Sequence, residues 1–207
     1  MAVVHNPLGT GTRIGECLGL RWDDLDFENR IININHSLTY RPTVETGASE
    51  MRISLPKTEA GIRTIPMLDV VKDAFEILRE EQEDTGYNEQ IIDGMYGFVF
   101  KNRFGEVPRP HTINQVIKRI VGSYNATEIL EAKKEKREPL ILPNFSCHIL
   151  RHTFATRLCE AESNLKVIQS VMGHRNVETT MDIYAEATDR KKQESFENLA
   201  AKLDNIF

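Results

Sequence analysis

The order of the hydrophobic patterns along the chain constrains its fold more than any other feature of the sequence. Three short segments, rich in isoleucine and interleaved with polar residues, lie at residues 30–40, 51–56 and 61–67. This alternation predicts β-strands, and the turn residues between the segments predict antiparallel pairing. Most other segments follow the helical period, so strands and helices never alternate. We therefore expect an α+β fold, mostly helical, with a small three-stranded antiparallel sheet at one edge.

Apolar residues at helical spacing predict the longer helices at residues 68–84, 111–125, 146–161 and 164–172. The first helix is expected to bury Val70, Val71, Ala74, Ile77 and Leu78, and the second Ile113, Val116, Ile117 and Ile120. Gly173 directly follows the last segment and is expected to end that helix.

A length of 207 residues suits one domain.

The distribution of charge along the chain is more informative than the net charge. The net charge of -5 works against a nucleic-acid partner, because phosphate contacts require Lys and Arg. Acidic residues concentrate at 76–93, whereas 101–111 and 117–120 carry positive charge with little acid. We expect an acidic face and a basic face.

Cysteine usage and hydropathy exclude several classes of protein. Cys17, Cys147 and Cys159 are far apart and form no CxxC pair, which argues against a disulfide framework and a cysteine-only zinc site. No apolar run approaches the length of a membrane span, and the first residues do not form a secretory signal. We expect a cytoplasmic protein that has no membrane partner.

One predicted helix carries several candidate functional residues. His148 lies three positions before Arg151 and four before His152, so the side chains are neighbours on a helix. A His pair four apart has zinc-ligand spacing, but the hydrolase motif requires Glu where Ile149 stands. Adding His174 to the pair gives a metallohydrolase alternative. His148 and Arg151 also suit an anion, since arginine presents a fixed fork of donors to phosphate.

Two further cations stand at turns. Arg13 begins a short predicted helix, where Glu16 three residues later can orient it. Lys57 follows the second predicted strand, and from a strand end its ammonium group can reach into a cleft. Neither residue is specific by itself, because isolated surface cations are usually only solvated.

The order of these residues is far more specific. The chain carries, in sequence, Arg13 in TGTRIGE, Lys57 in PKT, the motif HILRH, the motif MGH and Tyr184 in DIY. This series resembles the catalytic domain of the tyrosine recombinases, or phage-type integrases, from about residue 9 to 187. The stretches PKTEAGIRTIPM and VMGHRNVETTMDIYAEAT are especially similar to the integrases of conjugative transposons. The segment 40–50 is similar to a hairpin insertion in that branch.

The resemblance implies a site-specific DNA recombinase or integrase, a strand transferase that forms a 3'-phosphotyrosine and a free 5'-hydroxyl. Attack by a second strand then reseals the DNA. The implied roles are nucleophile for Tyr184, phosphate clamp for Arg13 and Arg151, acid for the leaving hydroxyl for Lys57, general acid/base for His148 and phosphate contact for His174.

The physical chemistry of these groups agrees with those roles. A phenol with an ordinary pKa of about 10 is a poor nucleophile at neutral pH unless cations and a base favour its anion. Two arginines stabilise the charge that grows on the phosphate oxygens. We expect no metal and no other cofactor, because the covalent intermediate keeps the energy of the phosphoester. The expected partners are double-stranded DNA and a tetramer formed on it, with weak or no association without DNA.

The expected domain organisation is a catalytic domain at 1–187, shorter at its start than in the family, and a helical tail at 188–207. The tail carries an apolar stripe, Phe196, Leu199, Leu203 and Ile206, and is expected to dock on the body or on a neighbouring protomer. The short leading segment leaves one alternative, a non-catalytic DNA-binding or assembly remnant of a truncated integrase.

Overall fold

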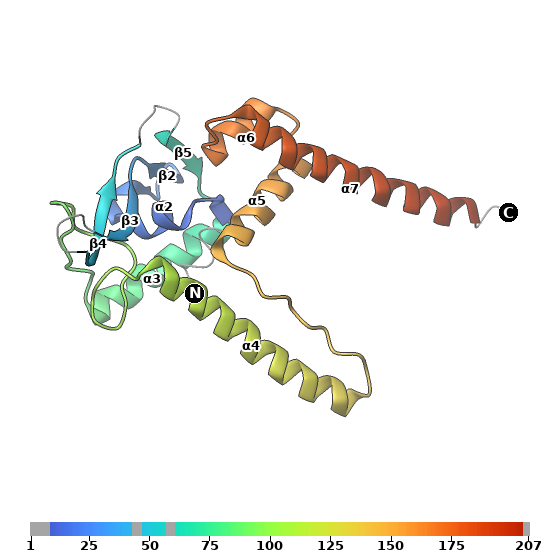
Figure 1. The fold of residues 1–207 in the computed structure, drawn as a ribbon, viewed down its shortest axis with the longest axis horizontal. Helices are drawn as coiled ribbons and strands as arrows, with labels where there is room; N and C mark the ends of the chain where they lie inside the picture. Colours follow the sequence, from blue (N-terminus) through green and yellow to red (C-terminus); the bar gives the residue numbers. More distant parts are fainter. Residues whose placement is uncertain (1–8, 43–46, 57–60, 205–207) are drawn as a thin grey trace.

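The computed structural model describes residues 9–42, 47–56 and 61–204 (Figure 1). Lys57 and Ile206 lie outside the described residues. The elements in chain order are α2 (Ile14–Gly19), the 3-10 turn η1 (Trp22–Asp24), β1 (Leu25–Asp26), β2 (Ile31–Ile34), β3 (Ser37–Pro42), β4 (Ser49–Ser54), β5 (Arg63–Pro66), α3 (Asp69–Thr85), α4 (Pro110–Glu135), α5 (Cys147–Ala161), α6 (Leu165–Met172) and α7 (Val177–Asp204). The described part of the chain contains no helix long and apolar enough to cross a membrane.

The α+β class with a small antiparallel sheet is confirmed, but the strands pair differently from the expectation. The three-stranded sheet has the order β1-β2-β5, and β3 and β4 form a separate two-stranded sheet. The segment expected as one strand at 30–40 therefore divides into β2 and β3. It divides at Asn35 and His36, where the buried His36 places its Nε2 2.6 Å from the carbonyl oxygen of Gly19. This contact turns the chain against α2 and away from the first sheet.

The register of β5 determines which of its side chains face inward. β5 pairs antiparallel with β2, from Ile31 opposite Pro66 to Ile34 opposite Arg63. Successive side chains of a strand point to opposite faces. Arg63 and Ile65 are accordingly buried, while Thr64 and Pro66 are exposed. A charged side chain thus occupies an inward position at the start of this strand.

The main core surrounds the short helix α2. Cys17 and Leu18 on α2 are completely buried, and side chains from the sheet and from α3 and α4 pack in the same cluster. On α3 the buried apolar residues are Val71 and Phe75, whereas Val70 and Ile77 are 55% and 65% exposed. The expected α3 stripe was therefore wrong at these two positions. Where two apolar residues are adjacent, either one can face the core of the protein, and the packing of the helix determines which one does.

The expected apolar stripe of α4 was also wrong at its last position, where Val121 is buried in place of Ile120. Ile113, Ile117 and Val121 are buried, and Ile120 is 55% exposed. These three buried residues are spaced four apart, which keeps them on one side of the helix. Figure 1 shows α4 leaving the body of the protein toward its C-terminal end.

A second, smaller core joins α5, α6 and α7. Its buried members are Ala155, Cys159, Ile168, Met172 and Ala187. As predicted, α6 ends at Gly173, which adopts the left-handed conformation with φ 60°. Helix α7 contacts both α5 and α6.

Helix α7 runs without interruption from Val177 to Asp204. The boundary expected after residue 187 falls within this helix. In Figure 1 the C-terminal half of α7 points away from the body, and Phe196 is 65% exposed. Docking of the tail stays a prediction.

Candidate active site

Arg13 stands at the N-terminus of α2 and is held there by Glu16. The Arg13 backbone N–H donates to Glu16 Oε2 at 2.8 Å, and Arg13 Nη1 donates to Glu16 Oε1 at 2.9 Å. Arg13 Nη2 reaches across to the carbonyl oxygen of Gly173 at 3.1 Å. The Arg13 side chain keeps 47% of its surface exposed. The expected orienting role of Glu16 is thus visible in its contacts, and the guanidinium remains open to solvent.

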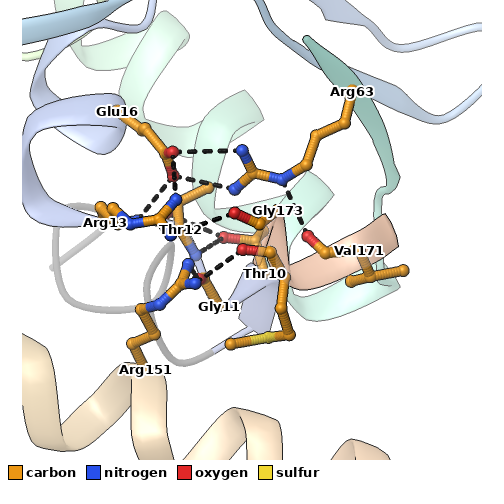
Figure 2. A network of polar contacts seen from close by, with 10 residues as sticks. Thr10, Gly11, Thr12, Arg13, Glu16, Arg63, Arg151, Val171 and Gly173 are labelled. Atoms are coloured by element: carbon orange, nitrogen blue, oxygen red, sulfur yellow. Dashed lines mark hydrogen bonds and ion pairs between the residues drawn. The ribbon is translucent and has the colours of Figure 1, made fainter. Parts of the chain in front are cut away.

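Arg151 approaches the same place from α5. It is 6% exposed and donates through Nη2 to the carbonyl oxygen of Met172 at 2.6 Å and through Nη1 to the carbonyl oxygen of Gly11. Arg13 and Arg151 therefore bind the carbonyls of two consecutive residues. Figure 2 shows the two guanidinium groups close together beside the turn at Gly173.

A third arginine, absent from the residues predicted from sequence, completes the network. Arg63 donates to both oxygens of Glu16, through Nη1 at 3.1 Å and Nη2 at 2.8 Å, and its Nε donates to the Val171 carbonyl at 2.8 Å (Figure 2). The Arg63 and Glu16 side chains are only 3% and 9% exposed. The signal that could have revealed Arg63 is the alternation of RTIP, which places a charged residue on the inward face of a strand.

The glycine at 173 allows the close approach of these groups. A Cβ on Gly173 would stand 2.8 Å from Arg63 Nη1 and 2.9 Å from its Cζ. The left-handed backbone at Gly173 also disfavours other residues. The glycine that ends α6 is therefore required by the Arg63 contact as well as by the helix terminus.

Positive charge exceeds negative charge in this network, and the pKa values reflect it. Burial raises the pKa of Glu16, but the hydrogen bond and charge of Arg63, followed by those of Arg13, outweigh burial and lower it to about 2. Burial together with the charge of Arg13 lowers the pKa of Arg151 to about 9. Arg13 and Arg63 bind the Glu16 carboxylate, and Arg151 binds only backbone carbonyls in this network, so an additional anion would be favoured beside them.

His174 joins the cluster as a buried neutral base. It is 8% exposed, and its Nδ1 lies 3.0 Å from the Thr180 hydroxyl. Burial lowers the pKa of His174 to about 4, and the charges of Arg151 and Arg13 contribute in the same direction. The imidazole is therefore uncharged at neutral pH and serves as a hydrogen-bonding group.

Among the described residues, His148 and His152 do not join these contacts, and Lys57 lies outside the described part of the chain. His148 is exposed in the first turn of α5, one helical turn before Arg151. His152 is 44% exposed and lies 3.8 Å from Glu186 of α7. The described residues contain no group of three or more His, Cys, Asp and Glu side chains that could hold a metal ion, so their geometry gives no support to the zinc alternative.

Tyr184 lies on α7, against the far half of α5. Its ring packs on the small core and lines a surface hollow together with Cys159, Glu160 and Lys192. Cys159 is just over two turns beyond Arg151, which corresponds to about 12 Å along a helix. No hydrogen bond among the described residues joins the Tyr184 hydroxyl to the arginines. The structure thus unites Arg13, Arg151 and His174, and holds Tyr184 outside their contacts.

Comparisons with known proteins agree on one family. The model of the phage integrase family matches residues 2–191. The transposase from transposon Tn916 of Enterococcus faecalis is 38% identical over 182 residues, which cover 87% of this chain and 40% of the relative. The prophage integrase IntR of Escherichia coli is 29% identical and covers 94% of this chain and 44% of the relative.

Solved structures give the same result. The Tn1549 transposon integrase in complex with transposon right end DNA is 36% identical, with a TM-score of 0.74 over 96% of this chain and 58% of that chain. The XerA recombinase, at 21% identity and a TM-score of 0.60, covers 93% of this chain and 57% of that chain and supports the fold alone. The chain spans about two fifths of the length of the curated transposon relatives. The resemblance to integrases of conjugative transposons is confirmed, and the chain belongs to the phage integrase family.

Proposed function

We propose that this chain is the catalytic domain of a site-specific DNA recombinase that cuts and rejoins strands through a 3'-phosphotyrosine. The observation that carries the proposal is the meeting of Arg13 and Arg151 at the carbonyls of Gly173 and Met172. Two guanidinium groups with a surplus of positive charge suit one phosphate of a DNA backbone. The similar Tn1549 integrase was captured with transposon DNA, which supports DNA as the ligand here.

In the proposed reaction, the Tyr184 oxygen attacks the scissile phosphorus and loses its proton to a base, for which His148 is the candidate. The bond from phosphorus to the 5'-oxygen breaks, and Lys57 gives a proton to that oxygen. Arg13 and Arg151 stabilise the additional charge on the non-bridging oxygens, and the neutral His174 donates a hydrogen bond to one of them. A 5'-hydroxyl of a second strand reverses these steps and releases Tyr184. One phosphoester replaces another, so the exchange needs no external energy source.

The placement of Tyr184 adds a requirement to this mechanism. Its side chain lines a hollow with Cys159, whereas the arginines meet at the carbonyls of Met172 and Gly173, which do not line that hollow. The nucleophile must come within about 3–3.5 Å of phosphorus to react. Catalysis therefore requires Tyr184 to leave its packing on α5 when DNA is bound.

A basic surface on α4 offers contacts for DNA beyond the scissile phosphate. Gln115, Lys118 and Arg119 are exposed and line one shallow hollow, and Arg119 also lines a second hollow with Arg103 and Arg109. These cations come from the two stretches, residues 101–111 and 117–120, in which the sequence concentrates positive charge, and Glu106 lines the second hollow with them. The cations of this surface offset locally the net charge of -5.

We also propose self-association on DNA into a recombination tetramer, with residues 1–187 forming the catalytic domain and 188–207 a docking tail. The exposure of Phe196 on α7 supports a partner for this tail. Because α7 points away from the body in Figure 1, docking on a neighbouring protomer is favoured over docking in cis.

The test is a covalent trap on a nicked suicide substrate, read on a denaturing gel with labelled DNA. The wild-type chain is expected to form an adduct, and Tyr184→Phe is expected to abolish it. Tyr124→Phe is the matched control, since Tyr124 is an exposed tyrosine of α4 and its loss should leave the adduct intact. An adduct that persists in Tyr184→Phe would overturn the assignment. Salt-dependent DNA binding without any adduct would support the non-catalytic alternative.

A further inference from the structure

Arg63 connects two parts of the site that the sequence places far apart. Its Nη1 and Nη2 bind the Glu16 carboxylate at the start of α2, and its Nε binds the Val171 carbonyl at the end of α6. Glu16 in turn holds Arg13. Met172, the next residue and the last of α6, provides the carbonyl that anchors Arg151. Arg63 therefore stands between the supports of both phosphate-binding arginines.

We propose that Arg63 is a positioning residue for strand cleavage, which fixes the α2 terminus against the α6 terminus and so sets the separation of Arg13 and Arg151. The inference rests on the proposed recombinase function. Arg63 is 7% exposed and uses all three of its nitrogens in these contacts, so its role is to hold other groups and not to bind the phosphate.

The chemistry of the contact explains why the position holds an arginine. The guanidinium is planar and presents its donors in a fixed fork, so it can grip a carboxylate with two nitrogens and a carbonyl with the third. A lysine in place of Arg63 would keep the charge but could not satisfy Glu16 and Val171 in the same geometry. Breaking a buried ion pair is destabilising, but replacing both partners by apolar residues often is not, so stability alone does not require an arginine at this position. Geometry at the site therefore accounts better for this pair than stability does.

The packing of Gly173 on Arg63 supports the same role. The Arg63 guanidinium lies so close to Gly173 that a Cβ would meet Nη1 at 2.8 Å and Nε at 3.1 Å. The Gly173 carbonyl is the group that binds Arg13. A displacement of Arg63 would thus be transmitted to Arg13 by two routes, through Glu16 and through the backbone at Gly173.

The first experiment measures cleavage and DNA binding separately in Arg63→Lys. The rate of adduct formation at saturating DNA should fall by about 100-fold, the cost of a displacement near 1 Å. The Kd for DNA should stay nearly unchanged, because contacts outside the scissile phosphate supply most of the affinity. Arg137→Lys is the matched control, since Arg137 also binds a glutamate, Glu128, with two nitrogens but lies just beyond the C-terminal end of α4. Equal cleavage rates in Arg63→Lys and Arg137→Lys would overturn the proposal.

A second variant covers the case in which Arg63→Lys does not fold. Gly173→Ala retains Arg63 but forces it to move, so it should reduce the cleavage rate with little change in the Kd for DNA. When both substitutions fold, the double variant should be hardly slower than the slower single variant, because both act through one contact. Effects that multiply in the double variant, or a wild-type rate in Gly173→Ala, would count against positioning by Arg63.

A third measurement separates this inference from the proposed function. Binding of inorganic phosphate, followed through the His174 imidazole signals by NMR, reports the arginine geometry without any reaction. Arg63→Lys should weaken phosphate binding about tenfold, the effect of impairing charged hydrogen bonds. A wild-type chain that binds phosphate in this Arg63-dependent way but forms no adduct would refute the recombinase function and keep the positioning role. If the wild-type chain forms an adduct, and neither adduct formation nor phosphate binding changes in Arg63→Lys, the positioning role is refuted and the recombinase function is kept.

Discussion

Arg13 and Arg151 donate hydrogen bonds to the carbonyl oxygens of consecutive residues, Gly173 and Met172, although Arg13 precedes α2 and Arg151 lies on α5. The backbone at the end of α6 is therefore the common reference for both guanidinium groups. A change that shifts this backbone, or the loop at Gly11 that also binds Arg151, should alter both arginines together.

Substitution of Gly11 tests how tightly the loop that binds Arg151 is packed. Gly11 has φ 64°, and a Cβ there would stand 2.4 Å from Phe154 Cδ1 and 3.0 Å from Met172 Sδ. Gly47 has a similar φ of 67° with nothing within 4 Å, so Gly47→Ala isolates the cost of the backbone conformation. That cost is about 1 kcal/mol, and overpacking should add roughly 1–3 kcal/mol in Gly11→Ala. Urea unfolding of both variants measures the difference. Equal losses in the two would show that the Gly11 site can relax.

Glu16 should make the chain sensitive to acid. Its pKa is about 2 in the folded chain against an ordinary value of 4.5, so the unfolded chain takes up the proton first as the pH falls. The stabilisation that ionised Glu16 gives to the folded chain is fully present above about pH 4.5 and is lost as the pH falls toward 2. The loss is on the order of 3 kcal/mol. Urea unfolding at a series of pH values should show a shallower dependence in Glu16→Gln.

The control for the acid series is Glu128→Gln. The hydrogen bond from Arg137 lowers the pKa of Glu128 to about 2 as well, but the Arg137 side chain is 42% exposed, so solvent screens this pair more than the Glu16–Arg63 pair. Its removal should change the acid dependence much less than removal of Glu16. A larger effect for Glu128→Gln would mean that the buried network does not dominate acid stability.

The sequence predicted the mostly helical α+β fold and the end of α6 at Gly173, and both are confirmed because periodicity and helix termination are local. The resemblance grouped Arg13 with Arg151 as a phosphate clamp. The structure brings the two side chains to adjacent carbonyls, and the clamp role stays a prediction. Arg63 was missed, since alternation along β5 shows that the residue faces inward but not that α6 lies opposite. The contact joins residues more than one hundred positions apart. Nothing local in the sequence encodes it.

Pairing of the strands and the position of Tyr184 also depended on tertiary structure. The run at 30–40 was expected as one strand because its alternation continues through Asn35, but burial of His36 beside Gly19 divides it. Likewise, the motif DIY identifies Tyr184 as a candidate nucleophile. Where its ring lies depends on how α7 packs on α5, which no pattern within the motif determines.

His174 should respond to an anion bound beside it. Its pKa is about 4 in the free chain against an ordinary 6.5, so the unfolded chain is protonated first and stability falls between these pH values. A phosphate would oppose the burial and the arginine charges that lower this pKa. Inorganic phosphate should therefore raise the His174 pKa in an NMR titration, with potassium chloride at equal ionic strength as the control. The same pKa in both salts would argue against an anion site next to His174.

Arg119 should contribute to DNA affinity through charge. It is exposed on α4 within the basic surface, where a phosphate contact releases counterions. Arg119→Gln should weaken binding of any DNA sequence and reduce the slope of log K against log salt by about 1. Fluorescence anisotropy over a range of salt concentrations measures both quantities. Lys133→Gln, near the other end of the same helix, should leave the slope unchanged, and a reduction of equal size there would show that net charge alone sets the affinity.

Phe196 should matter for assembly and not for the stability of the single chain. Its side chain is 65% exposed on the part of α7 that extends from the body, so Phe196→Ser removes no buried contact and should leave the unfolding temperature unchanged. If the tail docks on a neighbouring protomer, the same change removes apolar surface from that interface and should reduce assembly on DNA. Sedimentation with and without DNA distinguishes these effects. Deletion of residues 190–207 removes the whole tail and should reduce assembly at least as much as Phe196→Ser. Thr188→Ser, a small change at an exposed position earlier on α7, serves as the control. A Phe196→Ser chain that assembles on DNA like the wild type would show that this face of α7 does not dock.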